Sequence, residues 1–153
     1  RIARIFNTYG PRLDLKSTSQ YGRALIKFVF QALNNQSITV YGDGKQARSF
    51  CYITDQTIGL LRLLLTPGMD GEVVNIGNDN EISIIELVNK IVKVLGKHAE
   101  VTLNAQPNYD LTHDPRRRCP DITKARKTFN YNPTVDLEEG LRRTIEWIKS
   151  SSS

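Results

Sequence analysis

Apolar residues recur at helical spacing in five stretches of this 153-residue chain. In each stretch the apolar positions lie three and four residues apart, which is the pattern of a helix with one buried face. A serine, threonine or aspartate precedes each of the first four stretches and can cap the free backbone N–H groups of a helix. The pattern predicts helices over residues 21–33, 54–65, 84–95, 122–129 and 137–148.

The third of these helices carries the most detailed signals. Ser83 stands before it and Glu86 follows three residues later, which is the spacing of a capping box. Gly96 follows its last apolar residue and is suited to end a helix. The other predicted caps are Ser19, Thr54 and Asp121, each inferred from residue type and position alone.

Short β-prone runs lie between the helical stretches, at about residues 4–6, 38–41, 49–53, 72–76 and 101–103. The first run ends in a polar tripeptide, Asn7-Thr8-Tyr9, just before a turn at Gly10-Pro11. In open α/β sheets ligands bind outside the carboxyl ends of strands. An amide, a hydroxyl and a phenol at that point are suited to hold a polar ligand. The alternative is a buried strand that ends in an ordinary turn.

Composition places the chain among globular proteins, with 39% hydrophobic and 24% charged residues. The net charge is +5 and includes a run of three arginines, 116–118. Such a run suits nucleic acid, a small phosphorylated ligand or an ordinary solvated face. We expect no nucleic-acid partner, because no nucleic-acid motif accompanies the charge. No apolar run reaches membrane-spanning length and no signal peptide is visible.

The cysteine and histidine residues predict no metal site. Cys51 and Cys119 are far apart, and neither His98 nor His113 has a partner at ligand spacing. Two cysteines make a weak case for a disulfide, so a reducing, cytoplasmic compartment is the expectation.

Six motifs in order carry a resemblance to a known family. They are 7–12 (Asn-Thr-Tyr-Gly-Pro-Arg), 22–23 (Gly-Arg), 39–50, 74–78, 114–121 and 137–141. Together they resemble the C-terminal half of an extended short-chain dehydrogenase/reductase that acts on nucleotide sugars. The resemblance implies an α/β fold, made of the last Rossmann strand and a small mixed α/β substrate-binding domain, with NAD as cofactor and a UDP-sugar as substrate.

Within that family, Asn-Thr-Tyr-Gly-Pro and the later Arg118-x-Pro-Asp are most similar to UDP-glucuronate decarboxylases. Those enzymes make UDP-xylose through a 4-keto sugar. UDP-sugar 4-epimerases and dTDP-glucose 4,6-dehydratases are the alternatives on the same scaffold, and a sugar-nucleotide-binding module without chemistry is the non-enzyme alternative. A decarboxylase of eukaryotes would place the chain in the Golgi lumen instead of the cytoplasm.

Two motifs of the family are missing from the chain. There is no Gly-x-x-Gly-x-x-Gly turn for the NAD pyrophosphate and no convincing Tyr-x-x-x-Lys pair. We therefore expect the dinucleotide-binding part to lie upstream of Arg1, and the isolated chain to be inactive. The predicted division is 1–12 as the last Rossmann strand region, 13–149 as the substrate-binding part and 150–153 as a frayed tail.

The resemblance assigns roles to eight residues. Six would bind substrate, and they are Asn7, Arg23, Leu25, Phe28, Tyr41 and Arg48. Asn7 and Arg48 would hold the diphosphate, because a guanidinium can grip its oxygens with two parallel bonds. Thr8 would lie next to NAD, and Arg118 would act catalytically beside the sugar. Arg116 and Arg117 are expected to be solvated, and Asp55 to be no more than a first-turn carboxylate. A homodimer is implied by the resemblance only.

Overall fold

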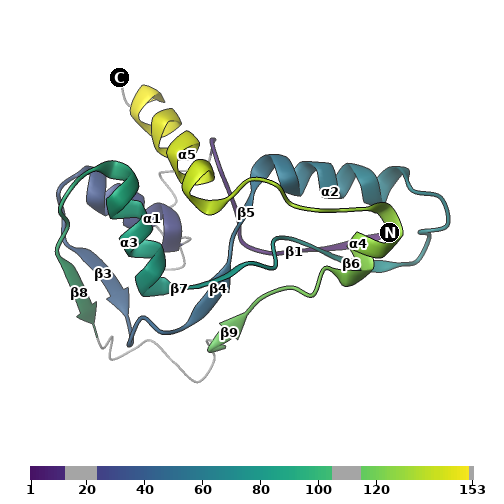
Figure 1. The fold of residues 1–153 in the computed structure, drawn as a ribbon, viewed down its shortest axis with the longest axis horizontal. Helices are drawn as coiled ribbons and strands as arrows, with labels where there is room; N and C mark the ends of the chain where they lie inside the picture. Colours follow the sequence, from purple (N-terminus) through teal and green to yellow (C-terminus); the bar gives the residue numbers. More distant parts are fainter. Residues whose placement is uncertain (13–23, 105–114, 152–153) are drawn as a thin grey trace.

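The computed structural model describes residues 1–12, 24–104 and 115–151. Within them the chain alternates helices and strands and forms a mixed α/β fold (Figure 1). The helices are α1 (Ala24–Leu33), α2 (Ile53–Leu65), α3 (Ile84–Leu95), α4 (Thr123–Phe129) and α5 (Leu137–Ser151). Helices α2, α3 and α4 begin and end within one residue of their expected bounds, and α5 continues three residues past the expected end at 148. Helix α1 ends at Leu33 as expected, whereas its predicted start at 21–23 and the predicted cap Ser19 lie outside the described residues.

The described strands are short and form four small sheets. They are β1 (Ile2–Ile5), β2 (Thr8–Tyr9), β3 (Ile38–Tyr41), β4 (Ala47–Ser49), β5 (Cys51–Tyr52), β6 (Val73–Ile76), β7 (Glu81–Ser83), β8 (Val101–Asn104) and β9 (Arg117–Arg118). The pairs β1–β6, β2–β5 and β3–β8 are parallel, and β4 lies between antiparallel β7 and parallel β9. These mainly parallel pairings are those of an α/β fold.

The buried side chains gather in two clusters. One joins α1, α3 and α5 to β3, and the other joins α2 and α4 to β6. In Figure 1 the first group lies to the left and the second to the right, with β4 and β5 running between them. The first cluster is larger, and its centre is formed by Val29, Val40, Leu87 and Leu141, none of which is exposed to solvent.

Helix α3 has the ends that its sequence predicts. The Ser83 Oγ accepts from the Glu86 N–H at 3.3 Å, and the Glu86 carboxylate accepts from the Ser83 N–H at 2.9 Å. Gly96 adopts the left-handed conformation, with a φ of 62°. The bonds from Ser83 hold the pKa of the Glu86 carboxyl below its usual value. The stabilisation of the fold by the Glu86 carboxylate is therefore complete at neutral pH. It is lost as the pH falls through the lowered pKa of Glu86.

The predicted cap of α2 is wrong. The helix begins at Ile53, directly after β5, and its N-cap residue is Tyr52, which makes no side-chain capping bond. Thr54 lies inside the first turn because β5 leads into the helix without an intervening loop. Asp55, expected to serve only the helix dipole, is buried and accepts bonds from the Thr134 and Val135 N–H groups at 3.1 and 2.9 Å.

Gly59 allows α2 to approach the second cluster closely. A Cβ at this position would lie 2.5 Å from Ile76 Cγ2 and 2.8 Å from Tyr131 Cε2. Both neighbours are fully buried and have no room to move. We expect Gly59→Ala to lower the free energy of unfolding by about 2 kcal/mol, because overpacking outweighs the gain in helix propensity. Urea denaturation measures this, and Thr57→Ala on the exposed side of α2 is the matched control, expected to change it by less than about 0.5 kcal/mol.

Candidate functional site

The polar tripeptide lies where β1 gives way to β2. Asn7 adopts a φ of 31°, which is uncommon for a residue other than glycine and bends the chain between the two strands. Its Nδ2 donates to the Ser49 carbonyl at 2.8 Å, so one amide N–H and the amide oxygen remain for a ligand. The Thr8 hydroxyl donates to Gln56 Oε1 at 3.1 Å. Tyr9 is buried in the first cluster, and this burial raises its pKa.

Arg48, predicted to bind substrate, and Arg118, predicted to be catalytic, are direct neighbours in the β4–β9 sheet. Arg48 on β4 is the register partner of Arg118 on β9. Residues directly opposite in paired strands project from the same face, so both guanidinium side chains leave the sheet on one side. Arg48 is buried, and its Nη1 donates to the Ala47 and Pro115 carbonyls at 2.7 and 2.9 Å. Two positively charged side chains on neighbouring strands favour an anion near them.

The arginine run divides into two ion pairs and one open side chain. Arg116 donates to Asp43 at 2.7 Å and Arg117 to Glu81 at 2.8 Å, and both arginines are exposed. The bond from Arg116 lowers the pKa of the Asp43 carboxyl. Arg118 is exposed as well and has no hydrogen-bond or ion-pair partner within residues 1–12, 24–104 and 115–151. Arg118 is thus the member of the run whose guanidinium is available to a ligand.

Tyr41 ends β3 and contacts a lysine that the sequence did not single out. Lys27 on α1 donates to the Tyr41 hydroxyl at 3.0 Å, and its ammonium lies over the ring at 4.6 Å from the centroid. The Tyr41 carbonyl accepts from Gln46 Nε2 at 2.9 Å, which ties the end of β3 to the turn before β4. The expected role of Tyr41 near the nucleotide stays a prediction.

Three of the predicted site residues remain: two lie in the buried core, and one is outside the described residues. Leu25 and Phe28 are buried in the first cluster, at 1% and 4% exposure. Packing against other described residues is enough to explain why both side chains are buried. Contact of either side chain with uracil stays a prediction. Arg23 lies outside the described residues.

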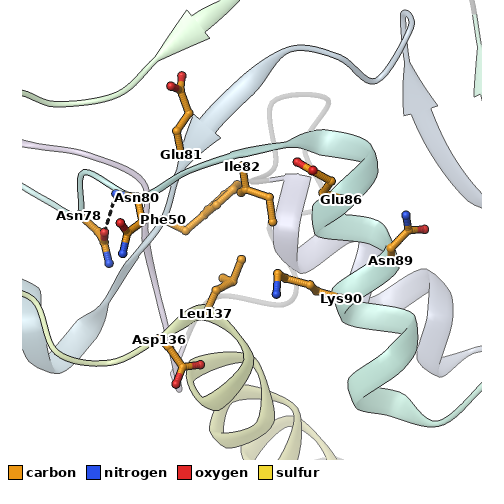
Figure 2. Close-up of a pocket in the computed structure, with 10 residues that line it drawn as sticks. All are labelled: Phe50, Asn78, Asn80, Glu81, Ile82, Glu86, Asn89, Lys90, Asp136 and Leu137. Carbon is orange, nitrogen blue, oxygen red and sulfur yellow. Dashed lines mark hydrogen bonds between the residues drawn. The ribbon is translucent and has the colours of Figure 1, made fainter.

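A pocket of about 520 Å³ opens beside the β4–β7 strand pair and was not predicted from the sequence (Figure 2). Ile82, the register partner of Arg48, is one of its lining residues. Its wall is formed by residues around β7, the first two turns of α3, the loop after β6 and the start of α5. None of the residues predicted to bind substrate or cofactor lines it. Phe50, which follows β4, is the lining residue nearest in sequence to Arg48.

Both cysteines are free thiols in the described chain. Cys51 is buried 3.5 Å from the Tyr131 hydroxyl, and burial raises the pKa of its thiol to about 11. The pKa of Cys119 is raised too, first by partial burial. Neither thiol is thus poised to react as a thiolate. The described residues contain no cluster of metal-ligating side chains, and no described helix is both long and apolar enough to cross a membrane.

Comparison with known proteins defines the class of protein to which this fold and site belong. Residues 1–144 match the family described as GDP-mannose 4,6 dehydratase, and the chain belongs to that family. The mixed α/β fold described above is the one expected for this family.

Particular relatives narrow the class further. The chain is 41% identical over 141 residues to UDP-glucuronic acid decarboxylase 5 of Arabidopsis thaliana, a match that covers 92% of this chain and 38% of the relative. The Bacillus cereus UDP-glucuronic acid 4-epimerase, solved with UDP-glucuronic acid and NAD, superposes with a TM-score of 0.84 at 32% identity. That superposition covers 98% of this chain and 45% of the epimerase chain.

A dehydratase is also among the similar structures. The dTDP-glucose 4,6-dehydratase of Bacillus anthracis, solved with NAD, superposes with a TM-score of 0.83 at 27% identity, covering 98% of this chain and 44% of the other. All three comparisons therefore span nearly the whole chain but less than half of each relative.

Proposed function

We propose that this chain is the substrate-binding part of an NAD-dependent enzyme that decarboxylates UDP-glucuronate to UDP-xylose. The observation that carries the proposal is the register pairing of Arg48 with Arg118, which sets two guanidinium groups on one face of a sheet beside the Asn7 loop. A nucleotide diphosphate and a uronate carboxylate are anions of the size that such a pair accommodates. The relatives named as UDP-glucuronic acid decarboxylases support the choice of reaction.

The roles of the chain's own side chains follow from their surroundings. Arg48 is fixed by two backbone carbonyls, so it suits a rigid contact to the diphosphate. Asn7, in the bend between β1 and β2, adds the amide N–H that its bond to the Ser49 carbonyl leaves over. Arg118 is exposed and has no partner in the described chain, so it suits the sugar, where the negative charge of the carboxylate changes during the reaction.

The chain by itself does not make a dinucleotide site. The glycine turn that would hold the NAD pyrophosphate is not in the sequence, and the candidate contact is limited to Thr8, whose hydroxyl already donates to Gln56. Thr8 thus fits a place at the border of the cofactor. Bound NAD would supply reversible hydride transfer at C4 of the sugar, so that the carboxylate can leave as carbon dioxide at the 4-keto stage and the returned hydride gives UDP-xylose.

Product analysis tests this proposal against its alternatives. Full-length protein is incubated with NAD and, separately, with UDP-glucuronate, UDP-glucose and UDP-galactose, and the nucleotide sugars are separated by chromatography. UDP-xylose and carbon dioxide from UDP-glucuronate are expected. Interconversion of UDP-glucose and UDP-galactose, or of UDP-glucuronate and UDP-galacturonate, would instead favour the 4-epimerases that the similar structures represent. Tight UDP binding without turnover of any of them would favour a binding module.

Arg48→Ala is expected to weaken UDP binding by roughly 1.5–3 kcal/mol, the range for a hydrogen bond to a charged group. Arg48→Lys is expected to recover only part of this loss, because a point charge does not replace the planar fork. Calorimetric titration with UDP measures both. Unchanged affinity in both variants would show that Arg48 supports the fold and does not contact the diphosphate.

The compartment and the assembly remain part of the proposal. A reducing, cytoplasmic location agrees with two free cysteines, one of them buried, in the described chain. A homodimer rests on the family resemblance alone, and sedimentation of the full-length protein tests it.

A further inference from the structure

The pocket between β7, α3 and the start of α5 has a composition unlike that of the arginine site. Its volume of about 520 Å³ lies within the range of small-molecule sites. Three carboxylates, Glu81, Glu86 and Asp136, line it together with a single cation, Lys90. Since acidic groups outnumber basic ones, the pocket disfavours anions such as a nucleotide diphosphate.

These charged groups are already engaged with neighbours. Glu81 pairs with Arg117, Glu86 accepts from the Ser83 N–H, and Asp136 accepts from the Glu139 N–H at 2.9 Å. Lys90 pairs with Glu138 at 2.8 Å. The carboxylates therefore do not require a cation in the pocket, but each keeps lone pairs that can accept a hydroxyl hydrogen.

Asn78 supplies the feature that points to a ligand. Its side chain lines the pocket and is only 6% exposed. The amide oxygen accepts from the Asn80 N–H at 2.8 Å, which fixes the orientation of the amide, and Figure 2 shows the Nδ2 group on the side away from that bond. Nδ2 has no partner within the described ranges 1–12, 24–104 and 115–151. Nδ2 is not one of the fully buried unpaired polar atoms in these ranges, so it stays accessible and can donate to an oxygen atom of a molecule in the pocket.

Apolar side chains complete the pocket. Phe50, Ile82 and Leu137 border it, and Figure 2 shows all three directed towards its middle. An aromatic and aliphatic surface beside amide and carboxylate groups suits a molecule with C–H faces and hydroxyl edges. We propose that this pocket binds a neutral, hydroxyl-rich molecule of monosaccharide size. The inference does not rest on the proposed function, because no residue of the arginine site contributes to it.

Titration followed by NMR tests the proposal with D-xylose and D-glucose as neutral probes, choline as a cation and UDP as an anion. With ¹⁵N-labelled protein, we expect saturable, millimolar binding of a neutral sugar that shifts the amide resonances of Phe50, Ile82 and Leu137. Asn78→Asp keeps the acceptor for the Asn80 N–H but removes the donor, and is expected to weaken sugar binding at least tenfold. Phe50→Leu removes the aromatic face at similar polarity and provides a second variant.

Thr57→Ala on the exposed side of α2 is the matched control, since Thr57 lies outside both the pocket and the arginine site and its replacement should leave sugar binding unchanged. Absence of saturation by either sugar would overturn the proposal. So would sugar binding that is insensitive to both Asn78→Asp and Phe50→Leu, or pocket resonances that respond more strongly to choline or UDP than to the sugars. UDP binding that fails while sugar binding persists would count against the proposed function alone.

Discussion

Replacing Arg118 with alanine in the full-length enzyme is expected to lower the turnover rate by about a hundredfold, the scale for losing one preorganised donor. Arg118 is exposed, lies opposite Arg48 in the sheet and has no partner in the described chain. If its guanidinium stabilises the charge that develops as carbon dioxide departs, the variant loses stabilisation of the transition state and keeps its ground-state binding of UDP. Turnover at saturating UDP-glucuronate and UDP affinity are measured on the same variant.

Arg117→Ala is the matched control for this prediction. Arg117 is the neighbouring residue of β9, carries the same side chain and is engaged with Glu81 at the surface. Its removal is expected to change turnover by no more than a few fold, because an exposed ion pair contributes little. A large loss of UDP affinity with near-normal turnover in Arg118→Ala would make Arg118 a diphosphate contact and would favour the epimerases over the decarboxylases.

Asp55→Ala is expected to lower the free energy of unfolding by roughly 3 kcal/mol, because it leaves several donors without an acceptor. The buried carboxylate accepts from the Thr134 N–H and hydroxyl and from the Val135 N–H. It thereby ties the first turn of α2 to the segment that leads into α5. Guanidinium denaturation followed by circular dichroism measures the loss.

Asp121→Ala is the comparison, because the exposed Asp121 carboxylate accepts local bonds from the side chain of Thr123 and from its N–H at 2.8 Å. A clearly smaller loss is expected there. Asp55→Asn keeps one oxygen and the shape of the side chain, so it should fall between the wild-type chain and Asp55→Ala. Equal losses in Asp55→Ala and Asp121→Ala would mean that the long-range bonds of Asp55 contribute no more than a local cap.

Local signals explain which parts of the fold were predictable. The capping box at Ser83 and the glycine at 96 act within one helical turn of α3, so the sequence predicted both ends of that helix. The cap at Thr54 was wrong because a strand runs directly into α2, which residue type alone does not reveal. The two-residue strands β2 and β9 were missed, since each exists only through a partner far along the chain.

The sequence predicted those residues of the candidate site that belong to recognisable motifs. The motifs singled out Asn7, Arg48 and Arg118, and the structure places the last two opposite each other. The structure also shows that Arg118 differs from Arg116 and Arg117, which form ion pairs with acidic residues 73 and 36 positions away in sequence. No local pattern encodes such pairing. The pocket was missed for the same reason, because several separate segments build its wall.

Strand β1 has a practical consequence for handling the chain. In the described residues it pairs on one side only, with β6, and Ile2 and Ile5 are more than half exposed. On α2, Leu64 and Leu65 are exposed as well. An open strand edge with isoleucines beside it is a template on which other copies can add their own strands. We therefore expect the 153-residue chain to aggregate when its solutions are concentrated. Ile2→Lys should raise the protein concentration at which light scattering first detects aggregates.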